Sequence, residues 1–425
     1  MHTLQVKPSD TLWRRFLGLV RPDRAVQANA ERCDANSADP VRLRNLREIS
    51  FKELLQREEA QVNMEEARRI AAGRSVLISG AGGSIGSELA RQVARANPSK
   101  LVLLDKSENS LFYVHLEARE LLGPARAKPV LADLLRREPL REIFASHRPE
   151  IVFHAAAHKH VSLLESHPHE AIRNNVLGTR NIAQAAIECG AAIFVNISTD
   201  KAVEPASYMG LSKKITELCI QELAREFGIR FCNVRFGNVA GSTGSVVRLF
   251  LDQIEKGGPV RVSHPRATRY FMSAREAAHL ILRAAALAEG GETFLREMGE
   301  PVNILGIAQR TAAFAGLQLG RDLRLEFTGL KEGEKLAEQL CESWEEPSAT
   351  AAEGIFAIRD QDPLAAGVLR HIDHMEALLA RDDREALRAY LWRLFPEFKR
   401  AARQVLEIPR KPPVAADERA SVHAL

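Results

Sequence analysis

Residues 75–86 read SVLISGAGGSIG, and this stretch decides the fold of the chain. An apolar run suited to a buried parallel strand stops at a glycine-rich turn, and a helical pattern begins directly after it. In this order Gly80 allows a tight turn, Gly83 lets the backbone approach a pyrophosphate, and Gly86 lets the helix pack closely on the strand. The stretch predicts a dinucleotide site with its phosphates at the helix N-terminus. A tight connection that binds nothing is the alternative.

The next apolar run ends in an acidic residue that suits the adenosine end of such a site. Asp105 follows the glycines by about 20 residues, where a carboxylate can accept hydrogen bonds from a ribose. Because a carboxylate repels a 2′-phosphate, this position favours NAD over NADP, although Lys106 and Ser107 could offset the repulsion. Asp133, after the following apolar run, either reaches the adenine or caps the next helix.

Strand and helix patterns alternate from Ser75 to about Arg235, which predicts an α/β protein with a Rossmann-type, doubly wound parallel sheet. Later segments are punctuated by glycine and lack this alternation, so we expect a smaller α/β substrate-binding lobe there. The expected organisation, in chain order, is an N-terminal helical arm and linker (1–45), a nucleotide-binding domain with a helical lead-in (46–236), a region that is mainly the lobe (237–345), a C-terminal helical region (346–407) and a disordered tail (408–425).

The overall composition excludes several classes of protein. Among 425 residues, 59 basic and 55 acidic side chains nearly cancel, so no field of the size that nucleic acids require is expected. The five cysteines are scattered and include no C-x-x-C pair, which indicates reduced thiols rather than a disulfide framework or a zinc site. No apolar run approaches the roughly 18 residues of a membrane span, and no signal peptide is evident. We therefore expect a cytoplasmic protein without an integral membrane segment.

The N-terminal arm contains a short basic amphipathic stretch, LWRRFLGLVR, at residues 12–21. Such a segment could rest on an anionic membrane surface or dock on a partner subunit. Packing against the arm's own protein is the alternative.

A second polar cluster follows a later strand, at the sheet edge where doubly wound proteins bind ligands. Thr199, Asp200 and Lys201 offer a hydroxyl, a carboxylate and an ammonium in succession. If burial and proximity shift their pKa values toward neutrality, they can act as hydrogen-bond donor, general acid and general base. A helix cap with a surface ion pair is the alternative. On the next helix Met209 and Lys213 are four residues apart and share a face.

The histidine-rich stretch at residues 154–160 suggests a metal, but its position at a strand end and its lack of carboxylate partners argue against one. We expect no metal site. Lys159 in this stretch is instead assigned to the substrate pocket as a cation, with His158 and His160 undecided.

Several ordered strings between about Arg47 and Glu338 resemble the UDP-N-acetylglucosamine 4,6-dehydratases of bacterial glycan synthesis, within the extended short-chain dehydrogenase/reductase superfamily. They are GAGGSIGSE (80–88), HAAAHKHV (154–161), NNVLGT (174–179), STDKAV (198–203), RFGNV (235–239), TRYFM (268–272) and GEKL (333–336). Large members of that family carry transmembrane helices ahead of the catalytic region, so this chain resembles the short form or a catalytic region alone.

The resemblance implies redox-neutral chemistry on NAD. Hydride leaves C4 of the sugar and returns at C6, while Lys201 removes the C5 proton and protonated Asp200 assists loss of the 6-hydroxyl as water. Thr199 could relay the 4-hydroxyl proton, because Met209 occupies the place of the superfamily's usual tyrosine. Members with methionine there resemble the subgroup that retains the configuration at C5.

Further positions follow from the same motifs. Ser84, Ile85 and Ala155 are assigned to the cofactor site, and Lys213 should hold the nicotinamide ribose. For the substrate, the assigned residues are Asn238 at the diphosphate, Arg269 at a phosphate or the uridine, and Glu334 and Lys335 in a nucleotide-closing motif. Structural hydrogen bonding or capping is the alternative for the last four. We also expect a homo-oligomer.

Three other functions stay open. A nucleotide-sugar 4-epimerase would share the cofactor site but would need the tyrosine rather than the Asp200–Lys201 pair. A C5-inverting dehydratase would differ in the tyrosine slot. A non-catalytic NAD-binding scaffold of a glycan assembly complex would fit the N-terminal arm, but it has no need for buried ionisable groups at residues 199–201.

Overall fold

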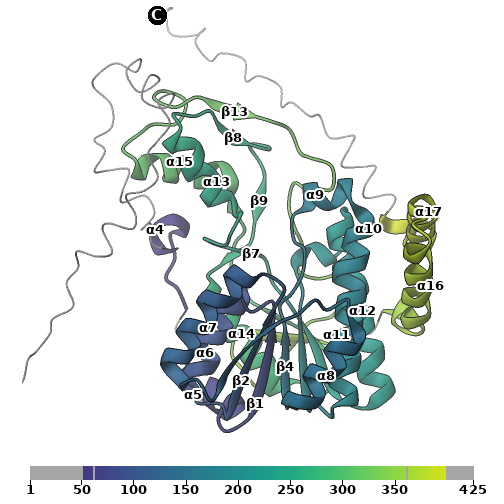
Figure 1. Ribbon diagram of the computed structural model, residues 1–425. Helices are drawn as coiled ribbons and strands as arrows, with labels where there is room; N and C mark the ends of the chain where they lie inside the picture. The colour runs from purple at the N-terminus through teal and green to yellow at the C-terminus, as the bar shows by residue number, and fades with distance from the viewer. Residues whose placement is uncertain (1–50, 61–62, 360–361, 399–425) are drawn as a thin grey trace, which may run out of the picture.

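The computed structural model describes residues 51–60, 63–359 and 362–398 (Figure 1). The predicted N-terminal arm and C-terminal tail lie outside these residues. Within the described ranges, no helix has the length and apolar character needed to cross a membrane.

The body is built on a twisted sheet whose strands, among the described residues, run in the order β14-β15-β11-β6-β5-β4-β1-β2-β3. All neighbours are parallel except at one edge, where β15 is antiparallel to both β11 and β14. The strands are β1 (Ser75–Ser79), β2 (Lys100–Asp105), β3 (Ala127–Leu131), β4 (Ile151–His154), β5 (Ile193–Ile197), β6 (Arg230–Arg235), β11 (Thr293–Arg296), β14 (Ser348–Ala349) and β15 (Ile355–Ile358). The order reverses between β1 and β4, and this reversal confirms the predicted doubly wound sheet.

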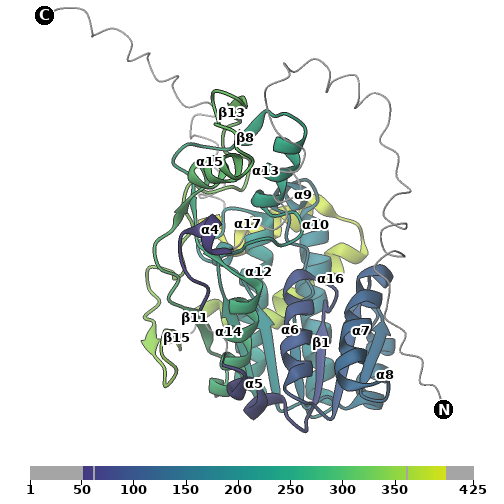
Figure 2. The same ribbon diagram turned by 90° about the vertical axis from the view of Figure 1, so that its left-hand side faces the viewer.

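Helices cover both faces of the sheet because successive strand residues point to opposite sides. Val76 and Ile78 pack toward one layer, whereas Leu77 packs toward the other. The first layer holds α5 (Met64–Ala71), α6 (Ser84–Arg95), α7 (Glu108–Leu122) and α14 (Ala274–Leu287), which Figure 2 shows from outside. The second layer holds α8 (Arg137–His147), the π-helical η2 (Ala171–Leu177), α11 (Gly178–Glu188) and α12 (Tyr208–Phe227).

A C-terminal helical hairpin lies over the second layer. It consists of α16 (Val368–Ala380) and α17 (Arg384–Leu394), preceded by the short η4 (Pro363–Ala365). Ile372, Met375 and Leu391 are buried in the same core as α12. As a result α12 is enclosed on both sides, as the right-hand edge of Figure 1 shows.

A smaller lobe sits above the carboxyl ends of the strands (Figure 1). Its separate core draws on helices and short strands from distant parts of the chain. Its elements are α4 (Phe51–Leu55), β7 (Asn238–Val239), α13 (Val246–Glu255), β8 (Val260–Val262), β9 (Thr268–Arg269), β10 (Phe271–Met272), β12 (Val302–Asn303), α15 (Ile304–Phe314) and β13 (Leu325–Phe327). The short α9 (Val161–Ser166) and α10 (Pro168–Glu170) lie between the lobe and the second layer.

The structure adds detail to the expected division of the chain. Residues 237–345, expected to be mainly the lobe, also supply α14 and β11 to the body of the molecule. Residues 346–407, expected to be helical, also supply β14 and β15 to the sheet. The strands β11, β14 and β15 are too short for an alternating pattern to mark them in the sequence.

A buried ion cluster joins the sheet to α12. The Arg235 guanidinium, with 1% of the residue exposed, donates at 2.7 Å to Glu217 Oε2 and at 2.8 Å to Glu345 Oε2. It also donates at 2.9 Å to the carbonyl of Leu340. One side chain therefore fastens the end of β6, the middle of α12 and the segment at residues 340–345.

We expect Arg235→Met to lower the free energy of unfolding by about 3–5 kcal/mol, because it leaves two carboxylates buried without their partner. Urea denaturation followed by circular dichroism measures this loss. The matched control is Arg261→Met, which breaks the exposed pair between Arg261 and Glu326 and should cost less than about 1 kcal/mol. Equal losses in the two variants would contradict the assignment of the Arg235 cluster as a structural anchor.

Candidate active site

A large cavity of about 920 Å³ opens at the carboxyl ends of the central strands, between the sheet and the lobe. Its wall combines the glycine-rich turn, the ends of β2, β4 and β5, the face of α12 and the start of α13. The glycine-rich turn and the polar cluster at residues 199–201, which lie far apart in the sequence, therefore meet at one cavity.

The glycine-rich turn is shaped for close approach of a phosphate. Gly80 has φ +68°, and a Cβ at this position would lie 2.6 Å from the backbone nitrogen of Ala156. A Cβ on Gly86 would lie 2.1 Å from the Gly80 carbonyl oxygen. Gly83 is the N-cap residue of α6 and has no side chain to cap it, so the first N–H groups of the helix are left for a ligand. Ser84 and Ile85 line the same wall. These features fit the pyrophosphate of a dinucleotide.

The predicted adenosine end lies next to this turn. Asp105 Oδ2 accepts from the Gly82 amide at 2.9 Å, and Oδ1 accepts from the Ser107 amide at 2.8 Å. Asp105 lines the cavity together with Lys106, whose Nζ donates at 2.9 Å to Asn174 Oδ1. The carboxylate is thus held in place by the backbone and faces the space where a ribose would lie.

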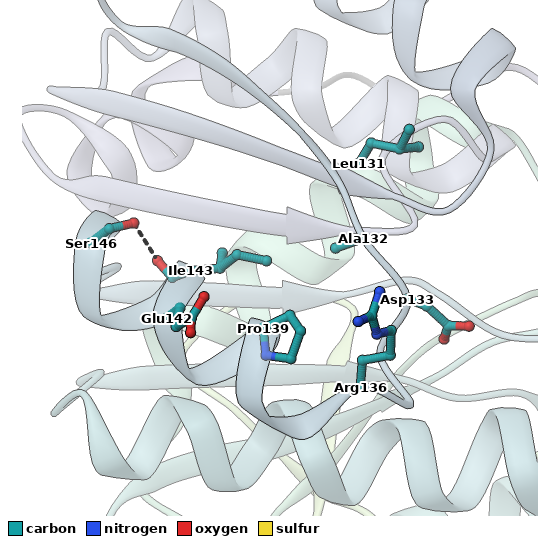
Figure 3. A pocket seen from close by; sticks show the side chains of 8 residues that line it. All are labelled: Leu131, Ala132, Asp133, Arg136, Pro139, Glu142, Ile143 and Ser146. Carbon is teal, nitrogen blue, oxygen red and sulfur yellow. Dashed lines mark hydrogen bonds between the residues drawn. The ribbon is translucent and has the colours of Figure 1, made fainter.

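Asp133 lines the cavity and does not cap the next helix, because the N-cap of α8 is Arg136. The Asp133 Oδ1 accepts from the Leu135 amide at 3.0 Å, in the turn before that helix. A second cavity of about 380 Å³ adjoins Asp133, lined among others by Pro139 and Ile143. In Figure 3 the Asp133 carboxylate points away from those two side chains.

Thr199, Asp200 and Lys201 form a compact hydrogen-bonded unit after β5, within the 3₁₀ turn η3 (Asp200–Ala202) and its N-cap. Asp200 Oδ1 accepts from Thr199 Oγ1 at 2.9 Å and from Lys201 Nζ at 3.0 Å. Lys201 Nζ also donates at 3.0 Å to Asn238 Oδ1. The pair is not a surface ion pair, because Asp200 is fully buried.

The three residues do not reach the cavity equally. Thr199 and Lys201 line it, whereas Asp200 stands behind them. Asp200 Oδ2 is buried and has no hydrogen-bond partner among the described residues. Burial acts to lower the pKa of Lys201, but the carboxylates of Asp200 and Glu338 outweigh it, so the pKa is raised. The site therefore holds a charged lysine beside a carboxylate with a spare acceptor atom.

The first turns of α12 contribute the next two predicted residues. Met209 and Lys213 are both buried on the cavity side of the helix. Tyr208 does not line the cavity, and its ring packs against Phe398 at a centroid distance of 5.1 Å. It therefore does not replace the absent tyrosine. Burial lowers the pKa of Lys213 to about 8, although Glu217 acts to raise it.

The predicted substrate residues divide into two groups. Lys159 and Asn238 line the cavity, and Lys159 Nζ donates at 3.4 Å to Ser242 Oγ. Arg269, Glu334 and Lys335 do not line it.

Instead, the latter three fasten the segment at residues 331–338. The Arg269 guanidinium donates to the carbonyls of Lys335 at 2.8 Å and Leu336 at 3.1 Å. Lys335 Nζ donates at 2.8 Å to the Val203 carbonyl, and Glu334 accepts at 2.8 Å from Ser263 Oγ. This geometry supports a structural hydrogen-bonding role for Arg269, Glu334 and Lys335.

The histidines at residues 154–160 are not grouped with other potential metal ligands among the described residues. His154 is buried, with its ring nitrogens 2.7 Å from Ser79 Oγ and 2.8 Å from Thr179 Oγ1. In the described part of the chain, no group of three or more potential ligands could hold a metal ion. Ala155, predicted at the cofactor, lines the cavity beside the glycine turn.

One residue near the reactive pair was missed at the sequence level. The side chain of Glu338 is 3% exposed, and its Oε1 lies 3.7 Å from Lys201 Nζ. It follows the GEKL string by two residues, but it lies in a segment without helical or strand pattern. Only that nearby string could have drawn attention to it.

Comparisons with known proteins agree with this fold. A family model described as polysaccharide biosynthesis protein matches residues 76–360. The chain is 46% identical to the capsular polysaccharide biosynthesis protein CapD of Staphylococcus aureus over 302 residues, which are 71% of this chain and 50% of that protein. It is 32% identical to a UDP-glucose 4-epimerase of Rickettsia canadensis over 277 residues, which are 64% of this chain and 78% of that protein.

The solved structures include a similar protein, Pen from Bacillus thuringiensis. It aligns with a TM-score of 0.63 and 29% identity over 69% of this chain and 91% of that one. The chain belongs to the polysaccharide biosynthesis protein family and has the fold of an extended short-chain dehydrogenase/reductase. It spans about half the length of the capsular and related polysaccharide proteins that it matches.

We expect Gly86→Ala to weaken NAD binding by at least about tenfold, because the added methyl group collides with the Gly80 carbonyl and forces the turn open. Isothermal titration with NAD measures the change. The control is Gly178→Ala at the start of α11, where a Cβ would make only ordinary contact, 3.6 Å from Leu134. NAD affinity that is unchanged in Gly86→Ala would contradict the dinucleotide site.

The pKa of Lys213 makes a separate prediction about pH. The ammonium is charged below about pH 8 and neutral above it, so its attraction for cofactor oxygens is lost as pH rises. We expect NAD affinity to fall about tenfold between roughly pH 7 and pH 9. Titrations at a series of pH values should show this fall in the unmodified protein, while Lys213→Met should bind more weakly and without the same dependence. A parallel fall in both would assign the effect to another group.

Proposed function

We propose that this protein is an NAD-dependent 4,6-dehydratase of a UDP-N-acetylhexosamine, with UDP-N-acetylglucosamine as the expected substrate. Its product would be a UDP-4-keto-6-deoxy sugar that keeps the C5 configuration, for use in bacterial polysaccharide synthesis. The observation that carries the proposal is the Asp200–Lys201 pair, whose buried carboxylate lies behind a lysine that lines the same cavity as the glycine-rich turn. Elimination of water needs an acid and a base beside a fixed redox cofactor, and this cavity combines the three.

The glycine turn, Asp105, Ala155 and Lys213 would hold NAD, as their placement around the cavity supports. When bound, the cofactor supplies reversible hydride transfer, which the proposed reaction uses at C4 and again at C6. The chain itself has to move protons and position the sugar.

Lys201 is proposed as the base for the C5 proton. Its ammonium donates to Asp200 Oδ1 at 3.0 Å, so a proton passed along this hydrogen bond leaves a neutral amine and a carboxylic acid. One transfer therefore prepares both the base and the acid. The resting lysine is charged, because Asp200 and Glu338 raise its pKa, so we propose that this transfer takes place during turnover.

The buried position of Asp200 requires a route into the cavity. Thr199 Oγ1 donates to Asp200 Oδ1 at 2.9 Å and lies on the cavity wall. We propose that the Thr199 hydroxyl carries the proton between Asp200 and the substrate oxygens. A hydroxyl both donates and accepts, so it can pass a proton without holding a charge.

Met209 supports retention at C5. A thioether has no exchangeable proton and cannot serve as acid or base. Proton removal and return at C5 then depend on Lys201 alone, which faces the sugar from one side. The UDP-sugar assignment also agrees with the similarity to the Rickettsia canadensis protein, a UDP-glucose 4-epimerase.

The deciding experiment is to incubate the purified protein with UDP-N-acetylglucosamine and NAD in deuterated water and to take NMR spectra of the product. We expect a 4-keto-6-deoxy sugar with deuterium at C5, retained configuration and no lasting accumulation of NADH. A C4 epimer that keeps its 6-hydroxyl would identify a 4-epimerase, and the C5 epimer as first product would identify an inverting dehydratase. A protein that binds NAD but converts no UDP-sugar would favour the scaffold function.

Among variants, we expect Lys201→Ala and Asp200→Asn each to lower kcat by at least about 100-fold, the usual cost of losing a general acid or base. Thr199→Val should also be strongly impaired, whereas Thr199→Ser keeps the relay hydroxyl and should stay active. Lys256→Ala, an exposed lysine on the lobe, is the control and should leave kcat unchanged. Initial rates at saturating substrate provide the measurement, and near-normal turnover of Lys201→Ala would contradict its role as base.

A further inference from the structure

Glu338 lies in a buried cluster of charges behind the reactive pair. Its Oε1 is 3.7 Å from Lys201 Nζ and 3.9 Å from Arg269 Nε, and its Oε2 is 3.8 Å from Lys335 Nζ. Oε2 has no hydrogen-bond partner among the described residues. A carboxylate that faces three cations at these distances, and makes no hydrogen bond with the free oxygen, acts through its charge.

The backbone around Glu338 is fixed independently of its side chain. Arg269 holds the carbonyls of Lys335 and Leu336 on one side, and Arg235 holds the carbonyl of Leu340 on the other. A change in the Glu338 side chain that preserves its size should therefore leave the segment in place. This separation makes the role of its charge accessible to experiment.

The charges of the cluster change during the proposed reaction. When the C5–H bond breaks, its proton forms a new N–H bond on Lys201, and the electron pair moves into the C4–C5 enolate. The C6–O bond then breaks, the leaving oxygen takes the proton that Asp200 supplies, and water leaves. Positive charge thus develops on Lys201 Nζ while Asp200 is still the protonated acid. Glu338 is the neighbouring carboxylate that can keep its charge throughout.

We propose that Glu338 is a positioning residue, which holds the Lys201 amine toward C5 and stabilises the ammonium that forms as the proton is taken. This inference rests on the proposed function for its catalytic consequence, but not for the electrostatic contact itself. The two hydrogen-bond partners of Lys201 fit this role, because Asp200 and Asn238 accept from its Nζ while the residue also lines the cavity. Without Glu338, Arg269 would oppose protonation of Lys201 at the stage when Asp200 is in its acid form.

The direction of the pH effect follows from the sign of this charge. The carboxylate of Glu338 raises the pKa of Lys201. The reactive pair needs one proton, which Lys201 holds at rest and passes to Asp200, so activity falls when pH rises through the pKa of Lys201 and this proton is lost. Removing the Glu338 charge lowers that pKa and moves this fall to lower pH. A role of Glu338 in packing alone would change activity at all pH values by the same factor.

The first test compares pH profiles of kcat and KM for the unmodified protein, Glu338→Gln and Glu338→Asp. In Glu338→Gln we expect kcat to fall about tenfold or more with little change in KM, and the loss of activity at high pH to move down by about one unit. Glu338→Asp keeps the charge, so its profile should stay near the original position. A reduced kcat with an unshifted profile in Glu338→Gln would overturn the proposal.

Glu342→Gln provides the matched control. Glu342 belongs to the same segment and also faces a buried lysine, because Lys214 Nζ donates to it at 3.0 Å. Within the described part of the chain Glu342 forms no ion pair with Lys201, so its loss should affect stability but not the pH profile. An equal shift in Glu342→Gln would show that the effect is not specific to Glu338.

The second test needs no turnover. Protein carrying ¹³C-labelled lysine is titrated by NMR, and the Lys201 signal is assigned by its absence from Lys201→Arg. We expect its titration midpoint to be lower in Glu338→Gln by about one pH unit. An unchanged midpoint would overturn the proposal. A lowered midpoint in a protein that dehydrates no UDP-sugar would support the contact between Glu338 and Lys201 while rejecting the proposed function.

Discussion

The ion cluster around Arg235 is the interaction on which the arrangement of the site depends. Its guanidinium occupies the last residue of β6, and its two carboxylate partners come from α12 and from the segment after the GEKL string. Glu217 also accepts a hydrogen bond from Ser198, the residue before the reactive threonine. Burial acts to raise the pKa of Glu217, but Arg235 outweighs it and the pKa is lowered, which keeps the cluster charged. The end of β6, the middle of α12 and the segment at residues 340–345 are thus held in fixed positions relative to one another.

This anchoring explains how a charged pair can be kept beside an apolar core. Two charges taken out of water are costly unless their remaining hydrogen bonds are met and their positions are fixed. Around Lys201, Asp200 and Asn238 accept its hydrogen bonds, while Glu338 adds a second negative charge. The site concentrates ionisable groups where the sheet ends and solvent is limited. Small changes of geometry there translate into large changes of protonation.

Much of the fold could be predicted because it depends on patterns of residues that are close together in the sequence. The glycine turn, the alternating apolar runs and the position of Asp105 each depend on a few neighbouring residues. The edge strands β14 and β15 could not be predicted, since their short sequences acquire strand geometry only by pairing, β15 with β11 and β14 with β15. The return of β11 to the sheet was hidden because this strand is also short.

The site could be predicted in part. Thr199, Asp200, Lys201, Met209 and Lys213 are close in sequence and were expected together. The depth of Asp200 behind Thr199 depends on the three-dimensional path of η3, which spacing alone does not give. Arg269 and Glu338 are separated from Lys201 by long stretches of chain, and their contacts arise from the folding of the lobe onto the sheet.

The repeated passage of the chain between sheet and lobe limits how the cavity can open. The chain crosses from one to the other at residues 236–245, 263–273, 297–303 and 328–347. A lobe joined by a single linker can rotate about a hinge, whereas a lobe joined by several chain segments resists such rotation. Access to the cavity should therefore come from short sliding of packed elements rather than from a wide hinge. A ligand would enter through a slightly widened opening of the cavity. The lobe residues that line the cavity would keep their positions relative to one another.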